Sequence, residues 1–423
     1  MARLKVLACA FACAAPGTEG FTGGESTLGW SILRQIARFH EVWALTRAVD
    51  RESIEQNLAE NPVPNLHFHY FELPSMFLPL LRIQGGHQIY YWLWQIQAYF
   101  VAKKLQKKIG FDLFHHVTYA NDWMASLIGA YLPIPYIRGP GGGAHRTPRG
   151  FEKEYSFTGR FWEKIRSAGQ WLFRHDPSFI KGHSRASAIM VCNREAMSAI
   201  PQKWAQKARF FPVNGISSND LEIAKPLEGP PKDVFKVLSA GTLIKVKGFG
   251  LAMKAFDEFA VRHPESTLTI IGSGPEGPKL HALAKSLESG DKINLVPHLT
   301  RDELLTEMAS HDVFLFPSLR DGGGAVVIEA MAAGKPVVCL DTGGPGMHVT
   351  SDCGIKVLPL NVEDASRQLG QALDKLFLDE DLRRKLGGAA RKKATDEYHW
   401  DRLGDQLKDV YDRALNPEVV PTI

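Results

Sequence analysis

The stretch that decides the fold reads Val313-Phe-Leu-Phe316-Pro-Ser-Leu-Arg-Asp321-Gly-Gly-Gly-Ala-Val-Val-Ile-Glu329-Ala-Met-Ala-Ala-Gly334-Lys-Pro-Val-Val338. An apolar run is followed by three glycines, an amphipathic segment, a further glycine and a second apolar run. This order predicts a strand, a glycine loop, a helix and a parallel strand, which together form a βαβ unit.

The same alternation extends outward over the whole chain of 423 residues. Strands are expected in the first half at Leu4–Ala10, Glu41–Leu45, Leu66–Phe71, Leu113–Val117, Pro135–Arg138 and Ala188–Cys192. A fresh series is expected at Phe235–Ala240, Leu268–Ile271, Ile293–Val296, Val313–Phe316, Pro336–Cys339 and Ile355–Val357. Helices such as Gly248–Arg262 and Pro278–Leu287 intervene, so the sequence predicts two open α/β sheets.

The two series are separated by residues 221–234, where Pro226, Pro230 and Pro231 stand among charged residues. Proline resists helix and lacks a backbone donor, so this segment is predicted to be a linker. The expected organisation is a first Rossmann-like domain over 1–220, the linker, and a second over 235–395. In open sheets of this kind ligands bind beyond the carboxyl ends of the strands, which predicts a site in a cleft between the domains.

Composition narrows the class of protein. A hydrophobic share of 44% and a charged share of 23% are ordinary for a soluble protein. The formal net charge of +4 does not suggest a nucleic-acid-binding protein, and no run approaches the roughly 20 apolar residues that cross a bilayer.

The apolar start, residues 1–16, resembles a secretion signal, but it runs into a glycine-rich loop, and a first strand explains it better. Five scattered cysteines indicate buried thiols in a reducing compartment, so we expect a cytoplasmic protein.

Several segments carry candidate chemistry. Glycines at the start of a helix let backbone N–H groups approach an anion, while Asp321 and Glu329 would face hydroxyls of a sugar and of a ribose. Lys247, before Gly248, would place an ammonium on a phosphate. Taken singly, each segment also fits an ordinary βα turn with solvated side chains.

Together, residues from about 235 to 354 resemble the nucleotide-sugar domain of the family-4 retaining glycosyltransferases. The hallmark of that family is an acid, seven residues and a glutamate, then Ala-Met-Ala-x-Gly-x-Pro-Val; Asp321, Glu329 and residues 330–337 hold these places. Gly241-Thr-Leu with Lys247-Gly248, Gly272-x-Gly-Pro275, Pro297-His298-Leu299 and Phe316-Pro-Ser318 follow in family order.

The resemblance implies the GT-B fold, in which two Rossmann-like domains face each other across a cleft and a final helix, here within 396–423, crosses back to the first domain. It implies that Asp321 and Lys247 take part in catalysis. The implied donor-binding residues are Gly241, Thr242, Lys247, Gly272, Gly274, Pro275, His298, Leu299, Gly322, Gly323, Gly324, Ala325 and Glu329. Two positions depart from the family: Thr242 replaces an arginine that would add a positive charge, and Asp321 replaces a longer glutamate.

The first half adds a second set of residues. Gly20-Phe-Thr-Gly23-Gly24-Glu25 resembles the Gly-Gly loop of the family's acceptor domain, and Arg138, Gly141 and Gly142 follow a later strand; these five, Gly23, Gly24, Arg138, Gly141 and Gly142, are expected to serve the acceptor or a phosphate. Many members carry a histidine near that strand end, where this chain has Gly139-Pro140. His115, His116 and His145 are nearby, and each is as well explained as a structural residue.

The resemblance implies transfer of a sugar from a nucleotide-sugar donor to a glycan, lipid-linked or small-molecule acceptor, as in polysaccharide biosynthesis. We expect no metal or other cofactor, since basic side chains and helix amino ends can meet the charge of the leaving phosphate. Two other functions stay open: a nucleotide-sugar 2-epimerase of the same fold, and a non-catalytic relative that binds nucleotide.

Aromatic residues with basic neighbours occur twice. One stretch is Ile89-Tyr-Tyr-Trp-Leu-Trp94 with lysines at 103, 104, 107 and 108; the other has aromatics at 161, 162, 171 and 173 among basic residues. Such stretches fit peripheral contact with the inner face of an anionic membrane. They also fit helices packed by their aromatics with solvated lysines outside.

Overall fold

A computed structural model gives the structure of residues 3–15, 24–83, 85–154, 157–226 and 234–415. The chain divides into two compact units: residues 1–144, 163–213 and 400–423 form the first, and residues 145–162 and 214–399 form the second. The divisions after residues 213 and 399 differ from those expected at 220 and 395. Of the expected linker, residues 227–233 lie outside the described residues, and Leu221–Ile223 belong to a helix.

The first unit is a seven-stranded parallel sheet in the order β3-β2-β1-β4-β5-β6-β7. Its strands are β1 (Lys5–Cys9), β2 (Glu41–Arg47), β3 (Leu66–Phe71), β4 (Leu113–His116), β5 (Tyr136–Gly141), β6 (Ala188–Val191) and β7 (Ala208–Phe210). Its helices are α1 (Gly24–Ala37), α2 (Arg51–Glu60), α3 (Gly86–Ile109), α4 (Leu127–Tyr131), α6 (Pro177–Arg185), α7 (Arg194–Ala199) and α16 (Trp400–Leu415), together with the part of α5 (Phe157–Arg174) that follows Trp162.

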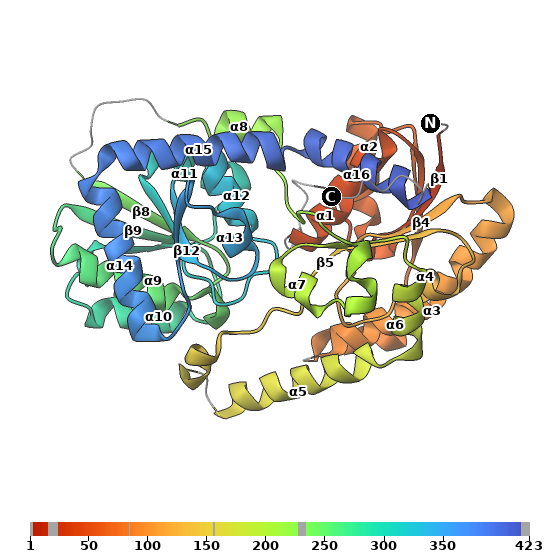
Figure 1. The fold of residues 1–423 in the computed structure, drawn as a ribbon, viewed down its shortest axis with the longest axis horizontal. Helices are drawn as coiled ribbons and strands as arrows, with labels where there is room; N and C mark the ends of the chain where they lie inside the picture. The colour runs from red at the N-terminus through yellow and green to blue at the C-terminus, as the bar shows by residue number, and fades with distance from the viewer. Residues whose placement is uncertain (1–2, 16–23, 84, 155–156, 227–233, 416–423) are drawn as a thin grey trace. The chain divides into compact units, whose positions relative to one another are not determined.

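The second unit is a six-stranded parallel sheet in the order β10-β9-β8-β11-β12-β13. Its strands are β8 (Phe235–Ala240), β9 (Ser266–Ile271), β10 (Ile293–Val296), β11 (Val313–Phe316), β12 (Val337–Leu340) and β13 (Gly354–Val357). Its helices are α8 (Ser218–Ile223), α9 (Phe249–Ala260), α10 (Gly277–Ser286), α11 (Arg301–Ser310), α12 (Ala325–Ala332), α13 (Gly343–His348), α14 (Val362–Leu378) and α15 (Glu380–Tyr398). Figure 1 shows α15 running along this unit past α8 and α12.

Helices cover both faces of each sheet, which explains why the strands read as continuous apolar runs rather than as alternating ones. In the second unit α9, α10 and α14 pack on one face. Helices α8, α11, α12 and α15 pack on the other, and neighbouring residues of β11 such as Phe314 and Leu315 point to opposite cores. The structure confirms the prediction of an α/β protein with two Rossmann-like units. The sequence missed β7, whose three residues include two that are exposed.

The last helix, α16, packs against α1 and β5 within the first unit. A buried histidine fixes this packing: His115 of β4 contacts the Tyr411 hydroxyl through Nδ1 at 2.7 Å and the Gly139 carbonyl through Nε2 at 2.6 Å. A carbonyl can only accept, so Nε2 carries the hydrogen and Nδ1 accepts from Tyr411. His116 is equally buried and contacts Tyr91 at 2.6 Å, so neither histidine is presented to solvent.

Burial lowers the pKa of His115 to about 4, although the hydrogen bond to Gly139 works in the opposite direction. The unfolded chain therefore binds more protons than the fold between about pH 6.5 and pH 4. We expect the stabilising contribution of neutral His115 to be complete above pH 6.5 and to be lost as the pH falls toward 4, by at most about 3 kcal/mol.

Thermal unfolding of the wild type and of His115→Gln, measured from neutral pH down to pH 4.5, checks this expectation. Gln keeps a donor near the Gly139 carbonyl but has no proton to gain, so the variant should start less stable and lose less on acidification. Equal acid sensitivity of the two proteins would contradict the prediction.

Candidate functional site

The candidate site of the second unit lies where the loops after β8, β9, β10, β11 and β12 meet. In a parallel sheet the carboxyl ends of neighbouring strands lie along one edge, so these loops are brought together although they are far apart in sequence. Backbone hydrogen bonds join each loop to its neighbour along the sheet.

The loops after β8 and β9 are interlocked. The Leu243 N–H donates to Ser273 O at 3.0 Å, and the Glu276 N–H donates to Leu243 O at 2.9 Å. A Cβ on Gly272 would lie 2.0 Å from Gly241 O, so only glycine allows the two loops to approach this closely. A Cβ on Gly274 would lie 2.5 Å from Leu243 O, so Gly272 and Gly274 both have a structural task in these loops. Contact of Gly241, Gly272, Gly274 and Pro275 with the donor stays a prediction.

The loop after β10 joins the same edge. The His298 N–H donates to the Ser273 hydroxyl at 3.3 Å, and the Gly272 N–H donates to Val296 O at 3.0 Å. His298 is exposed and Leu299 partly buried, and the two follow β10 directly. Their expected contact with the donor stays a prediction.

The loops after β8 and β11 place Lys247 beside Asp321. Lys247 lies in a short 3₁₀ turn (Lys245–Lys247), and the Leu319 N–H donates to Val246 O of that turn at 2.9 Å. The Lys247 ammonium forms an ion pair with Oδ2 of Asp321 and lies 5.4 Å from the centre of the Phe316 ring. The two residues expected to act in catalysis, 74 positions apart in the chain, are thus in contact.

Asp321 turns toward its own loop as well. Its Oδ1 accepts from the N–H groups of Gly323 at 3.1 Å and Gly324 at 2.8 Å. Burial alone would raise the pKa of this carboxyl, but the charge and hydrogen bond of Lys247, with the two amides, hold it below its ordinary value. The sequence suggested that these amides face an anion and that Asp321 faces sugar hydroxyls; in the structure the anion facing them is Asp321. Its short side chain closes an Asx-type turn over the next residues, which a longer glutamate would not do in the same way.

The glycine loop ends at the start of α12. Gly324 is the residue before the helix and has a left-handed φ of 58°, which glycine adopts without steric cost. The Val327 N–H donates to Gly324 O at 3.0 Å. Ala325 and Val326 supply the first N–H groups of α12, which have no acceptor among the described residues and point out of the helix end.

A buried histidine supports the loop from the other side. His348, in α13, contacts Gly323 O through Nε2 at 2.9 Å and the Tyr398 hydroxyl through Nδ1 at 2.9 Å. Burial lowers the pKa of His348 to about 4, against the opposing effect of Gly323, so the ring is neutral at physiological pH. His145, which belongs to the second unit, also lies against the loop, because a Cβ on Gly322 would be 3.2 Å from its ring.

Glu329 lies on α12 and is 8% exposed. Its Oε1 accepts from Nη1 of Arg301 at 2.5 Å, and Nε of the same arginine donates to Asp220 at 2.9 Å. Asp220 also forms the capping box of α8 with Ser217, accepting from both its N–H and its hydroxyl. Arg301 thus links the starts of α8 and α11 to the acid on α12.

In the Asp220–Arg301–Glu329 network the two carboxylates are buried and the arginine side chain is 42% exposed. Burial disfavours the Arg301 cation, but the two carboxylates outweigh it and raise its pKa. Arg301 in turn holds the pKa of Asp220 below its ordinary value although burial opposes this. Sequence reasoning missed Asp220 and Arg301, because their meeting depends on the packing of three helices that no local pattern announces.

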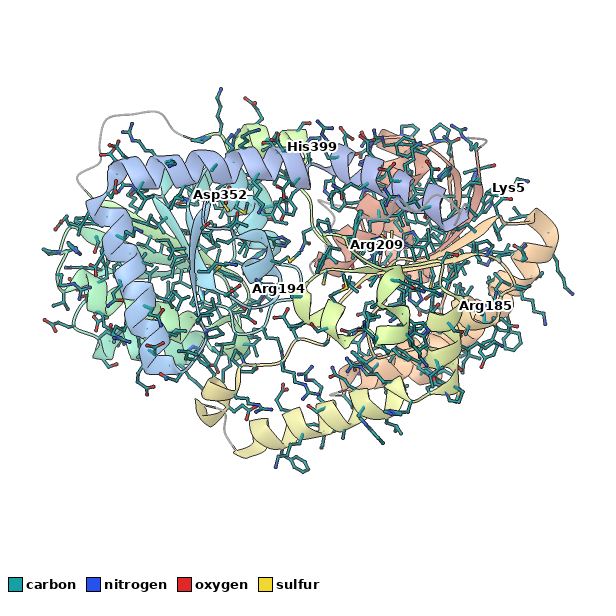
Figure 2. All side chains as sticks on the ribbon, viewed as in Figure 1. Lys5, Arg185, Arg194, Arg209, Asp352 and His399 are labelled. Carbon is teal, nitrogen blue, oxygen red and sulfur yellow. The ribbon has the colours of Figure 1, made fainter. Side chains whose placement is uncertain are left out.

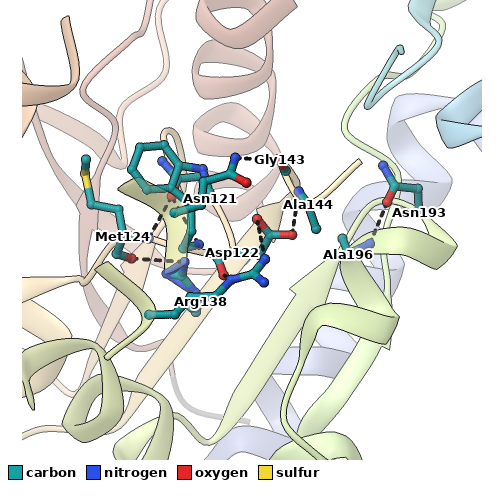
Figure 3. Close-up of polar contacts among 11 residues, drawn as sticks. Asn121, Asp122, Met124, Arg138, Gly143, Ala144, Asn193 and Ala196 are labelled. Carbon is teal, nitrogen blue, oxygen red and sulfur yellow. Dashed lines mark hydrogen bonds and ion pairs between the residues drawn. The ribbon is translucent and has the colours of Figure 1, made fainter. Parts of the chain in front are cut away.

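The residues expected in the first unit are arranged differently. Gly23 lies outside the described residues, and Gly24 is the first residue of α1. Arg138 is 2% exposed, and its Nη2 donates to Met124 O at 3.3 Å (Figure 3). Its guanidinium lies 6.0 Å from the centre of the Phe179 ring. The structure places this cation inside the unit rather than at its surface. Gly141 is buried in β5, and Gly142 is partly buried beside Cys192.

Sequence reasoning also missed Asp122, which Figure 3 shows next to this glycine run. Its side chain is nearly buried, and Oδ2 accepts from the Ala144 N–H at 2.8 Å. Burial raises its pKa, with Arg174 and Arg138 working in the other direction. Asp122 therefore holds the start of the segment that leaves the glycine run.

Known proteins resemble the second unit and most of the length of this chain. Residues 222–393, which contain every strand of the second sheet and the loops described above, match the family model named Glycosyl transferases group 1. An uncharacterized glycosyltransferase of Methanocaldococcus jannaschii is 26% identical over 340 residues, covering 75% of this chain and 81% of that protein.

Solved structures share the fold of the whole chain. Sucrose-phosphate synthase of Thermosynechococcus elongatus has a TM-score of 0.63 at 18% identity, over 97% of this chain and 99% of that one. HepE of Anabaena, solved in complex with UDP and glucose, has a TM-score of 0.61 at 16% identity, over 97% and 100%. The fold is that of the GT-B glycosyltransferases, and the family model and the relatives together support a glycosyltransferase.

Proposed function

We propose that the chain is a retaining glycosyltransferase of family 4 that moves a sugar from a nucleotide-sugar donor to a glycan, lipid-linked or small-molecule acceptor. The observation that carries the proposal is the contact of Lys247 with Asp321 beside the glycine loop that opens α12. A cation, a turn of backbone N–H groups and a helix amino end converge there, which is what a diphosphate requires.

The donor diphosphate would compete with Asp321 for this place. The Asp321 carboxylate accepts hydrogen bonds from Lys247 and from the amides of Gly323 and Gly324. It therefore has the position and the charge of a phosphate oxygen. On binding, the phosphate would take Lys247 and the helix end, and Asp321 would turn toward the sugar hydroxyls. Glu329 would accept from the ribose hydroxyls while Arg301 holds its other oxygen.

In the reaction that we propose, the bond between the anomeric carbon and the phosphate oxygen breaks, and its electron pair leaves with the nucleoside diphosphate. The acceptor oxygen bonds to the same face of the sugar, and its proton passes to the leaving phosphate. Lys247 and the amino end of α12 stabilise the negative charge that grows on that phosphate. No protein residue is assigned as the general base.

The setting that we propose is the cytoplasm, where the five buried cysteines would stay reduced, and the task is polysaccharide assembly. That no metal or cofactor takes part is also a proposal, founded on Lys247 and the helix end. A thermal-shift screen over nucleotide sugars is the first test, because a tight ligand raises the unfolding temperature by mass action.

Lys247→Ala tests the role of the ammonium. We expect transfer to slow by about a hundredfold, and binding of the nucleoside diphosphate to weaken, since a charge that stabilises the leaving group is lost. Steady-state kinetics and calorimetric titration measure the two effects. Lys254→Ala, which removes an exposed lysine of α9, is the control. Unchanged rate and affinity in the Lys247 variant would refute the proposal.

Thr242→Arg tests the departure from the family at the exposed loop after β8. An arginine there should add one charge-assisted hydrogen bond to the diphosphate and tighten its binding by about tenfold. Thr242→Gln, which is long but neutral, is the matched control and should bind like the wild type. If Arg and Gln have the same effect, the diphosphate does not lie near residue 242.

Glu329→Gln tests ribose recognition. The wild type should bind its preferred nucleoside diphosphate about fivefold to tenfold more tightly than the 2′,3′-dideoxy analogue, because a buried carboxylate accepts from the hydroxyls. The variant should lose that preference. The ratio of two affinities measured on one protein is insensitive to any loss of stability from the broken pair with Arg301. A preference retained in full would exclude Glu329 as the ribose ligand.

A further inference from the structure

Helix α3 of the first unit is apolar on two sides. One side is in the core and carries Tyr90, Tyr91, Trp94, Ala98 and Ala102, all fully buried. These aromatics are packed in the interior, as one reading of the sequence expected. The other side carries Ile89, Leu93, Ile96 and Phe100, which recur at the spacing of a single helical face.

This second side is open. Phe100 is 63% exposed and Ile89 is 51% exposed. The preceding 3₁₀ segment, η2 (Ser75–Arg82), adds Met76 at 76%, and Ile83 follows at 57%. An outward helix face is normally polar, so a continuous apolar face of this kind indicates something that covers it.

A groove runs between η2 and α3. Its volume is about 510 Å³, and it is lined by Leu73, Phe77, Leu93, Ile96, Gln97, Phe100, Val101 and Lys104. Apart from Gln97 and the lysine at its end, these side chains are apolar. We define the α3 surface as this groove together with the exposed residues Met76, Arg82, Ile83, Ile89, Trp92, Lys103, Lys107 and Lys108.

The charge of the α3 surface is of one sign. No aspartate or glutamate occurs between Glu72 and Asp112. Over the same span the exposed basic residues are Arg82, Lys103, Lys104, Lys107 and Lys108. None of these lysines forms an ion pair with a residue that the structure describes. Four lysines in the last two turns of α3 therefore follow directly on Phe100.

Neighbouring helices pack beside α3. Arg185 of α6, labelled in Figure 2, donates to the carbonyls of Gly129 at 3.3 Å and Leu132 at 2.9 Å and so ties α6 to α4. Tyr131 of α4 lies 6.1 Å from the Tyr99 ring of α3. Helix α3 thus packs against α4, and α4 packs against α6 (Figure 1).

We propose that the α3 surface docks on an anionic lipid bilayer. Ile89, Trp92 and Phe100 enter the boundary between headgroups and acyl chains, and the lysines at 103, 104, 107 and 108 meet the anionic headgroups. Apolar side chains beside uniformly basic ones fit such a boundary, and the absence of acids between Glu72 and Asp112 removes the repulsion that an anionic membrane would otherwise meet. A nucleic acid would leave the exposed apolar residues uncovered. The proposal does not depend on the transfer reaction.

The second aromatic stretch lies on α5. Trp171 and Leu172 are exposed there, while Gln170 donates to Gly143 O at 3.2 Å on the inward side. Phe173 contacts Trp123, with ring centres 5.6 Å apart. This helix also turns apolar side chains outward.

The experiment is sedimentation of the full chain with vesicles of phosphatidylcholine, with and without phosphatidylglycerol. The wild type should bind only when phosphatidylglycerol is present, and salt should weaken the binding. Replacing all four lysines, in Lys103→Gln, Lys104→Gln, Lys107→Gln and Lys108→Gln together, should weaken it by at least about a hundredfold, at roughly fivefold per lysine. Phe100→Ser should weaken binding even at low salt, since it removes an apolar side chain without touching charge.

A matched control removes the same charge from the second unit, at the exposed residues Lys254, Lys285, Lys385 and Lys392. It should bind vesicles like the wild type. The proposal is overturned if the wild type does not sediment with anionic vesicles, or if the control loses as much affinity as the α3 variant. It is also overturned if Phe100→Ser converts a dimer to a monomer without changing vesicle binding, which would make the surface a contact between copies. Transfer to a water-soluble acceptor, measured in parallel, keeps a failure of docking distinct from a failure of the proposed function.

Discussion

The carboxylate of Asp321 is the constraint on which the second unit's loops depend. A buried negative charge has to be met by donors, and those donors come from two loops: the ammonium of Lys247 and the amides of Gly323 and Gly324. The contacts of Asp321 with these donors fix the turn after β8 against the loop after β11. The first turn of α12 is fixed with it. The same contacts that satisfy Asp321 assemble a place where a phosphate would be satisfied too.

Much of the fold could be predicted from the sequence because its strands are buried on both faces. Such strands read as short apolar runs, and the predicted ranges at Phe235–Ala240, Ile293–Val296 and Val313–Phe316 agree with the structure residue for residue. Strand β7 lies at a sheet edge with Arg209 and Phe210 exposed, so its sequence lacks that signal. Gly272 was read as part of a binding motif, whereas its closest constraint is the carbonyl of Gly241.

The sequence brought candidate site residues to notice, but it did not predict the contacts that they make with one another. Family order brought Lys247, Asp321 and Glu329 to notice, and the structure places all three around α12 and the loops before it. Family order could not predict where these side chains point. Whether the acid at position 321 meets a hydroxyl of a ligand or an amide of its own loop depends on the one methylene by which aspartate and glutamate differ. Nor could family order show that Arg138 is enclosed, or that Arg301 joins Asp220 to Glu329, because these follow from long-range packing.

The peptide between Gly323 and Gly324 takes its direction from the His348 ring behind the loop. A trans peptide is planar, so its C=O and its N–H point in opposite directions. His348 holds the carbonyl of this peptide on one side, and the N–H is thereby turned to the other side, where Asp321 accepts it. The Gly323 carbonyl can only accept, so Nε2 of His348 carries the hydrogen and Nδ1 accepts from the Tyr398 hydroxyl. The direction of a backbone donor in this loop is therefore set by the ring of His348 behind it, and the Tyr398 hydroxyl at the end of α15 holds that ring without contacting the loop.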